Sequence, residues 1–405
     1  MRLANANAGL WAIGNGLISS TLVIYLASAW GAFGLAVSFI LAAPRFAGLL
    51  RLAVPAMMAS FRNRKAICVW AFLASAIVIW MIPAAAILNE RIPQQTALTI
   101  LVTAWCLYHL LEYIGSVALW SWLGDLTPRP IRGRLLGERE RWLVAGRVIG
   151  LVISVTIALL WDRLAPNAPR WRPLAVSAVA GAVFMALAVV PIGFMPPVRH
   201  ASSAVPSAPW RTLWHAVVDP AYRRLLIFNC VFSAVNGLAA AAQEMFPMRV
   251  LGISYAGMQS LRGLTRVGQF IFAPLVGRLT DRLGNRPVMI VGQLIVATGS
   301  LFYLAATPTN WWPVSGAFVV WIAYVALNVG LDNIKLKLAP QDNNAPYLAV
   351  YQAVSDLVNG VTIIVGGLLI DERLRAGGSD AITLYAQIFL CAWIGRTLLA
   401  GYLAR

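Results

Sequence analysis

Twelve apolar runs, each long enough to cross a lipid bilayer, constrain the fold of this chain more than any other feature. A helix needs about 20 mostly apolar residues to cross the ~30 Å hydrocarbon core. Of the 405 residues, 60% are hydrophobic and 12% are charged, against roughly 25% charged residues in a soluble domain. A helix satisfies its own backbone polar groups in lipid, so every run is predicted to be a transmembrane helix. The expected spans are residues 10–30, 32–54, 66–88, 96–123, 141–161, 174–196, 225–245, 256–279, 288–306, 313–335, 347–370 and 381–403.

A polar interruption at residues 199–224 divides six spans from six. Its sequence, RHASSAVPSAPWRTLWHAVVDPAYRR, holds prolines, serines and basic residues, as linkers do. We therefore expect an all-α membrane protein with twelve transmembrane helices. An N-terminal six-helix bundle would occupy residues 1–198, a cytoplasmic linker 199–224, and a C-terminal six-helix bundle 225–405.

The two halves share loop patterns at corresponding places. The loop LTPRPIRGRLLG at 126–137 and the loop LAPQDNNAPYLA at 338–349 both begin Leu-x-Pro. An acidic residue precedes each loop, Asp125 in the first half and Asp332 in the second. These matches predict two parallel six-helix repeats, related by a pseudo-twofold axis.

The net charge of +17 does not indicate a nucleic-acid partner, because the basic residues lie in short groups between apolar runs rather than on one face. Most of the 32 lysines and arginines face the cytoplasm if both termini are cytoplasmic, which is the orientation that the positive-inside rule favours. The first apolar run is long enough to span and is expected to be retained rather than cleaved as a signal peptide. We therefore expect a multi-pass protein of the inner or plasma membrane. All four cysteines lie in apolar runs, so no disulfide, metal site or cofactor is expected.

The stretch GRLTDRLGNRP at 277–287 resembles the signature loop of the major facilitator superfamily, and GDLTPRPIRGRLLG at 124–137 resembles the loop after that family's fourth span. The resemblance implies a transporter fold in which spans 1, 4, 7 and 10 line a central cavity and spans 2, 5, 8 and 11 form the seam between bundles. It also implies secondary transport by rocking of the two bundles around a central site.

The same resemblance assigns a gating role to the loop at 277–287. Gly277 would let a neighbouring helix approach. Asp281 would accept hydrogen bonds at the N-terminus of span 5, near residues 137–141, while Arg282 holds the loop at the cytoplasmic surface. Arg147 in span 5 is a further gating candidate. The other interpretation is a plain positively charged turn, and the matching loop of the first half departs from the pattern because it has Pro55 and Ala59 instead of glycine and aspartate.

Ionisable residues inside spans are costly and are functional candidates by default. Arg45 and Asp356 lie at similar depths, roughly 14 Å from the cytoplasmic ends of spans 2 and 11, so an ion pair between them is one interpretation. Glu112 and Arg147 could form another pair, and both pairs could be purely structural. Glu244 is expected to be solvated at the outer end of span 7. Arg396 is expected on the outside of its bundle.

Span 4 contains candidates for proton coupling. His109 and Glu112 lie one helical turn apart on the same face. Histidine has an unperturbed pKa of about 6.5, which suits proton uptake and release, and a buried glutamate can also bind a proton near neutral pH. Asp356 is the third candidate. The alternative for His109 is a core histidine that simply bonds a neighbour.

Candidates for solute binding centre on two arginines. Arg45 and Arg266 belong to different halves of the chain and lie near mid-membrane, where forked hydrogen bonds from both could clamp a carboxylate or phosphate. Trp105 and Trp321 are expected to form aromatic cavity walls. Any polar candidate could instead bond a neighbouring helix. The remaining candidates are Gln269, Asn15, Tyr324, Asn328 and Asn359.

No nucleophile with a base, no metal-ligand spacing and no Gly-rich phosphate-binding loop occurs in the sequence, so an enzyme is not expected. We expect a monomeric secondary transporter, symporter or antiporter, for a small anionic or zwitterionic organic solute, with protons as the coupling ion. The alternative is a non-transporting assembly factor or receptor with the same fold.

Overall fold

The structure is a computed structural model that describes residues 2–53, 63–126, 132–197, 209–339, 345–375 and 381–404. Its contacts divide the chain into two compact units. The first contains Met1–Ala32 and Phe46–Ser207, and the second contains Phe33–Arg45 and Ala208–Arg405. Residues 54–62, which include Pro55 and Ala59, residues 127–131 and residues 340–344 lie outside the described residues, as do residues 199–208 of the expected linker.

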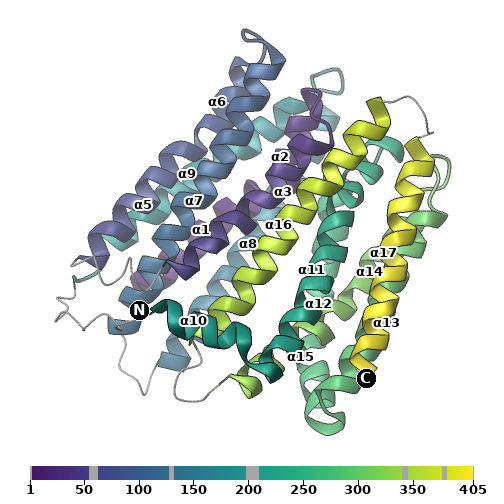
Figure 1. Ribbon diagram of the computed structural model, residues 1–405. Helices are drawn as coiled ribbons and strands as arrows, with labels where there is room; N and C mark the ends of the chain where they lie inside the picture. The colour runs from purple at the N-terminus through teal and green to yellow at the C-terminus, as the bar shows by residue number, and fades with distance from the viewer. Residues whose placement is uncertain are drawn as a thin grey trace. The chain divides into compact units, whose positions relative to one another are not determined.

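The first unit is built from helices that lie beside one another along much of their length (Figure 1). The span expected at 10–30 is broken between Leu17 and Ser20, where the side chain of Ser19 accepts a hydrogen bond from the backbone N–H of Leu22 and so begins a new helix. The elements are α1 (Arg2–Leu17), α2 (Ser20–Ala29), the 3₁₀ turn η1 (Leu49–Leu52), α5 (Arg64–Ile79), α6 (Met81–Leu88), α7 (Gln94–Leu126), α8 (Arg132–Leu164) and α9 (Trp171–Gly193).

The second unit is also helical, and α13 packs beside α17 while α11 packs beside α16 (Figure 1). Helix α3 (Gly34–Gly48) belongs to this unit as far as Arg45. The expected linker contains a helix of its own, α10. The elements are α10 (Pro209–Val218), α11 (Pro220–Met245), the π-helical turn η3 (Phe246–Val250), α12 (Tyr255–Leu283), α13 (Asn285–Ala305), α14 (Pro313–Val320), the 3₁₀ turn η4 (Trp321–Ala323), α15 (Tyr324–Leu338), α16 (Ala345–Arg375) and α17 (Ala381–Ala404).

The helices agree with the predicted membrane spans. In the described part of the chain, eleven helical segments are long and apolar enough to cross a membrane. Helix α12, which contains the span expected at 256–279, has 29 residues and is long enough as well, but it is more polar because it carries Arg262 and Arg266. The predicted all-α membrane fold is confirmed, and its eighth span is the one that breaks the apolar pattern.

The stretch at 277–287 is less of a loop than its sequence indicates. Helix α12 continues through Leu283, four residues past the expected end of the span, and α13 begins at Asn285. Between them Gly284 has a φ of 87°, a left-handed conformation that glycine adopts at little cost. Asp281 and Arg282 therefore lie on the last helical turn, exposed, and the chain reverses at a single glycine.

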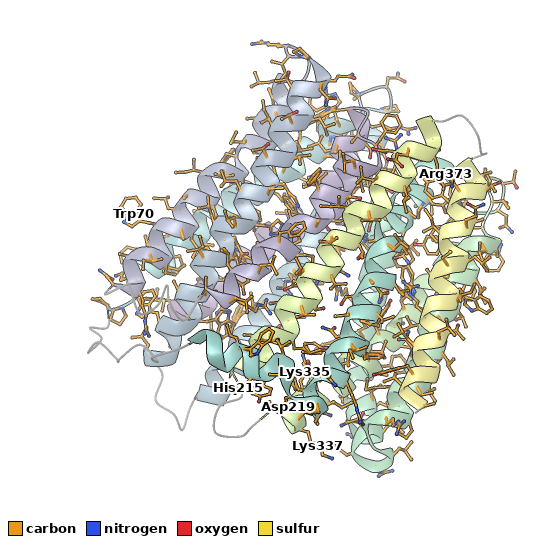
Figure 2. All side chains as sticks on the ribbon, viewed as in Figure 1. Trp70, His215, Asp219, Lys335, Lys337 and Arg373 are labelled. Carbon is orange, nitrogen blue, oxygen red and sulfur yellow. The ribbon has the colours of Figure 1, made fainter. Side chains whose placement is uncertain are left out.

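Apolar side chains on the outer faces of the helices are exposed, as a surface that faces lipid requires. Trp70 of α5 is 68% exposed and points away from the helices (Figure 2). Several charged groups of the second unit lie at its ends. Asp219, Lys335 and Lys337 lie toward one end, and Arg373 is at the opposite end (Figure 2). From the sequence, these two ends are expected on opposite sides of the membrane.

Helix α3 is attached to α16 by a buried carboxylate and two glycines. Asp371, 6% exposed, accepts hydrogen bonds from the backbone N–H groups of Gly34 at 2.6 Å and Leu35 at 3.1 Å. These are free donors at the start of α3, where the helix dipole also favours an anion. A Cβ on Gly34 would lie 2.5 Å from the carbonyl oxygen of Gly367, so the two backbones approach in a way that only glycine permits.

We expect Asp371→Ala to lower the melting temperature of the purified protein in detergent. Loss of a helix-capping side chain costs about 0.5–2 kcal/mol, and here the change would leave one buried and one partly buried donor without their acceptor. The matched control is Glu372→Ala, because Glu372 is adjacent and exposed. Equal melting temperatures for the two variants would show that the capping contact contributes nothing to stability.

Candidate functional site

A cavity of about 450 Å³ lies in the second unit. This volume falls within the ~300–1,000 Å³ typical of small-molecule sites. Its wall combines basic, amide, hydroxyl and aromatic side chains from α3, α11, α12, α13 and the segment α14–η4–α15. The lining residues are Arg45, Gln243, Glu244, Met258, Arg262, Thr265, Arg266, Gln269, Tyr303, Phe318, Trp321, Tyr324 and Asn328.

Irregular turns of helix shape the cavity wall. The expected tenth span is interrupted by the 3₁₀ turn η4, which starts at the lining residue Trp321. Side chains of α12 bond to backbone oxygens at this interruption: Thr265 Oγ1 donates to the carbonyl of Phe318 at 2.7 Å, and Gln269 Nε2 donates to that of Trp321 at 3.2 Å. The π-helical turn η3 follows Glu244 almost directly. Such turns often mark functional sites in helices.

Glu244 is a correction to the sequence analysis, which expected it to be solvated at the end of its span. The residue is buried, 7% exposed, and forms an ion pair with Arg262 of α12. The helical segment continues beyond Glu244 to Val250, so the glutamate is not at the end. The apolar residues that follow it in the sequence, Met245 to Pro247, were the signal that could have revealed this.

Arg45 and Asp356 form the ion pair that their depths suggested. Arg45 Nη1 lies 3.4 Å from Asp356 Oδ1, and the Asp356 side chain is 5% exposed while that of Arg45 is 47% exposed. Gln352 Nε2 also lies 3.4 Å from the same oxygen. Asp356 thus holds the charged end of Arg45 beside the cavity, from α16.

Arg396 is the second correction, because it was expected on the outside of the bundle. It is 1% exposed. Its Nη1 donates to Ser300 Oγ at 3.0 Å, and its Nε and Nη2 donate to Asn236 Oδ1 at 3.2 and 2.9 Å. Helix α17 is apolar along most of its length, so its sequence does not indicate which face points inward.

The seven predicted solute-binding residues fall into two groups. Arg45, Arg266, Gln269, Tyr324 and Asn328 line the cavity. Asn359 instead donates to the carbonyl oxygen of Ser233 at 3.1 Å and holds α16 to α11. Asn15 lies on α1, in the first unit. Gln243, Met258, Thr265, Tyr303 and Phe318 line the cavity as well, although the sequence analysis did not select them.

The proton-coupling candidates of span 4 lie on α7 in the first unit. Nε2 of His109 is buried without a hydrogen-bond partner among the described residues, and the ring makes an edge contact with Trp105 at 4.4 Å between centroids. Glu112 accepts a hydrogen bond from Ser116 Oγ at 2.6 Å.

Arg147, the further gating candidate, lies on α8. Its guanidinium is 5.8 Å from the centroid of the Trp11 ring, and the described residues contain no salt bridge between it and Glu112. The expected contact of Asp281 with span 5 would join the two units and stays a prediction. No described atom of the second unit lies within 4 Å of a Cβ built on Gly277.

A family model matches part of the chain. Residues 225–374 match the model described as Major Facilitator Superfamily, which agrees with the resemblance of the loop at 277–287, while the loop at 124–137 lies outside the matched residues. The search of curated proteins by sequence found no match. The family match and the solved transporters below indicate a transporter rather than an enzyme.

Three solved structures share the fold over nearly the whole chain. The D323A mutant of the nucleoside transporter NupG has a TM-score of 0.70 and 15% identity, covering 100% of this chain and 98% of its own. A D-xylose-proton symporter has a TM-score of 0.69 and 16% identity, covering 99% and 96%. A POT family transporter in complex with 5-aminolevulinic acid has a TM-score of 0.67 and 12% identity, covering 98% and 94%.

We expect Glu244→Gln to destabilise the protein, and Glu244→Gln combined with Arg262→Gln to recover part of the loss. The single change removes the carboxylate that Arg262 faces in a largely buried setting, at a cost of roughly 1–3 kcal/mol, whereas the double change removes both charges. Melting temperatures in detergent give the comparison. Glu90→Gln is the control, because it breaks an exposed pair with Arg172 and should have almost no effect. Strictly additive losses in the double variant would contradict this coupling.

Proposed function

We propose that this chain is a transporter of the major facilitator superfamily that carries a small anionic or zwitterionic organic solute across the membrane by alternating access, with protons as the coupling ion. The observation that carries the proposal is the charge of the cavity in the second unit. Arg45, Arg262 and Arg266 line it, against one lining carboxylate, that of Glu244.

The charge balance favours an anionic group in the solute. Glu244 pairs with Arg262, and Asp356 pairs with Arg45. Among these groups the guanidiniums of Arg45, Arg262 and Arg266 outnumber the carboxylates of Glu244 and Asp356. In a site of reduced dielectric constant a guanidinium attracts an anion more strongly than it would in water. A guanidinium also offers two parallel donors to a carboxylate or phosphate.

The fold alone does not choose among solute classes. The solved neighbours include a nucleoside transporter, a D-xylose-proton symporter and a transporter in complex with 5-aminolevulinic acid. These solutes differ in charge while the fold is shared, so the residues of the site must select the solute. The xylose symporter, which is named for its proton coupling, supports the proposal that protons drive transport.

A non-transporting assembly factor or receptor is the second candidate function. The loop with Pro55 and Ala59 favours it, because that loop lacks the glycine and aspartate of the family pattern. The charged residues of the cavity, which lie within predicted spans, favour transport, since intramembrane charges are costly without a functional role. Uptake of labelled gluconate into sealed proteoliposomes, with protein-free liposomes as the control, separates the two.

Both termini are proposed to lie in the cytoplasm, and the protein is proposed to act as a monomer. His109, Glu112 and Asp356 remain the proposed proton carriers. His109 combines burial with a ring nitrogen that has no partner among the described residues, and Glu112 is one turn away. This arrangement supports proton exchange in span 4, at a distance in sequence from the cavity residues.

We expect Glu112→Gln to abolish accumulation of the solute under an imposed pH gradient while leaving exchange of solute across the membrane partly intact, because the amide cannot bind and release a proton. Accumulation and counterflow of labelled gluconate in proteoliposomes measure the two activities. Glu90→Gln serves as the control, since Glu90 is in the same unit and its side chain is 58% exposed. Unchanged accumulation in the Glu112 variant would remove this residue from the coupling mechanism.

We expect Arg266→Lys to weaken binding of gluconate about tenfold or more, without lowering the melting temperature. Lysine keeps the charge but loses the forked pair of donors. Titration calorimetry in detergent measures the binding. Sorbitol, which has the same six carbons without the carboxylate, should not bind to the wild type.

Arg278→Lys is the matched control, because Arg278 is an exposed residue of the same helix outside the cavity. If Arg266→Lys bound gluconate as well as the wild type while Arg266→Ala unfolded, Arg266 would be a structural residue. Equal affinities for sorbitol and gluconate would refute the anionic solute.

A further inference from the structure

Arg396 is a buried cation whose hydrogen-bond partners are neutral. At 1% exposure it is among the largest fully buried side chains of the described chain. Ser300 Oγ and Asn236 Oδ1 accept hydrogen bonds from its guanidinium, and within the described residues it forms no salt bridge. A charge in such a place is expensive unless its donors are satisfied. The arginine therefore holds its neutral partners in fixed orientations.

Asn236 is the partner whose orientation matters. A guanidinium has donors only, so the amide oxygen of Asn236 must face Arg396. The amide nitrogen donates to the carbonyl oxygen of Phe232 at 2.8 Å, which agrees with that orientation. Asn236 Oδ1 is thereby presented as an acceptor to a third group, the hydroxyl of Tyr324 at 2.8 Å.

Tyr324 lines the cavity, and the fixed amide determines what its hydroxyl can do there. A phenol hydroxyl has one hydrogen to donate, and Tyr324 donates it in the hydrogen bond to Asn236 Oδ1. The Tyr324 oxygen is left with acceptor capacity, and no described group donates to it. A solute in the cavity consequently meets this hydroxyl as a hydrogen-bond acceptor rather than as a donor.

Gln269 also offers a hydrogen-bond acceptor to the cavity, for an independent reason. Its Nε2 donates to the backbone carbonyl of Trp321, and a carbonyl can only accept. No described group donates to the amide oxygen Oε1, so Gln269, which also lines the cavity, offers an unused acceptor there. Two side chains next to the irregular turn at Trp321 present acceptors, whereas the arginines present donors.

We infer that the solute of this cavity carries hydrogen-bond donors, hydroxyl or ammonium groups, in addition to its anionic group, and that Tyr324 and Gln269 select for them. The inference rests on the proposed function, in that the cavity is taken as the solute site. Arg396 and Asn236 are positioning residues that act through the Tyr324 hydroxyl. An anion without donors would leave both acceptors desolvated and unpaired, which is a strong basis for discrimination.

The test compares three six-carbon carboxylates by titration calorimetry on the full-length protein in detergent. Hexanoate carries no donor, gluconate carries hydroxyl donors, and 6-aminohexanoate carries an ammonium group. The wild type should bind gluconate or 6-aminohexanoate at least about tenfold more tightly than hexanoate, the difference expected for one or two hydrogen bonds. The two donor-bearing compounds distinguish hydroxyl from ammonium recognition.

Tyr324→Phe should reduce this preference about tenfold, because the variant should bind the donor-bearing compound more weakly and hexanoate as tightly as the wild type does. Tyr402→Phe is the matched control, because Tyr402 lies outside the cavity, where its hydroxyl bonds to the carbonyl of Arg224 at 3.4 Å. A wild type that bound hexanoate as tightly as both donor-bearing compounds would overturn the inference while leaving the anionic solute intact. Binding of none of the three would overturn both.

The positioning role of Asn236 is tested by two substitutions at that residue. Asn236→Asp keeps an acceptor for Tyr324 and for Arg396, so the preference for donors should persist. Asn236→Leu removes the acceptor and frees the Tyr324 hydrogen, so the preference should fall about tenfold, with folding checked by melting temperature. If Asn236→Asp lost the preference as completely as Tyr324→Phe while remaining folded, the positioning role of Asn236 would be wrong.

Discussion

The cost of burying charge governs the second unit of this protein. A guanidinium or carboxylate inside a hydrophobic bundle needs a partner in a fixed place. Three arginines are satisfied by residues from other helices: Arg262 by Glu244, Arg45 by Asp356, and Arg396 by Asn236 and Ser300. These contacts connect α3, α11, α12, α13, α16 and α17. The polar cavity exists because the same contacts hold charged groups inside the apolar surroundings.

Backbone polar groups inside the bundle also need hydrogen-bond partners. At the interruption of the tenth span, the carbonyl oxygens of Phe318, three residues before the start of the 3₁₀ turn, and of Trp321, its first residue, also accept hydrogen bonds from the side chains of Thr265 and Gln269. These bonds fix both side chains of α12 against the interrupted helix. The amide of Gln269 thereby acquires a defined polarity toward the cavity. Irregular backbone at membrane depth is tolerated where protein side chains satisfy it, and here it also orients the site.

Much of the site could be predicted from the sequence because charged and polar residues in apolar runs are conspicuous. Arg45 and Arg266 were selected as charged residues inside spans. Gln269, Tyr324 and Asn328 were selected as polar residues on spans that the resemblance places at the cavity or the seam, and all five line the cavity. Glu244 and Arg396 were misplaced. Hydropathy marks the approximate depth of a residue but not the direction in which its side chain points, and a helix that is apolar on every side has no amphipathic pattern to show its inner face.

The sequence by itself determined the approximate positions of the membrane spans and the all-α membrane fold, because bilayer thickness and backbone hydrogen bonding translate directly into runs of apolar residues. Only the tertiary structure decided the partners. Asn236 and Tyr324 are 88 residues apart, and Asn236 and Arg396 are 160 apart. No periodicity along one helix can specify contacts over such distances. The polarity of the Tyr324 hydroxyl follows from the packing of three helices, and packing is what sequence patterns leave open.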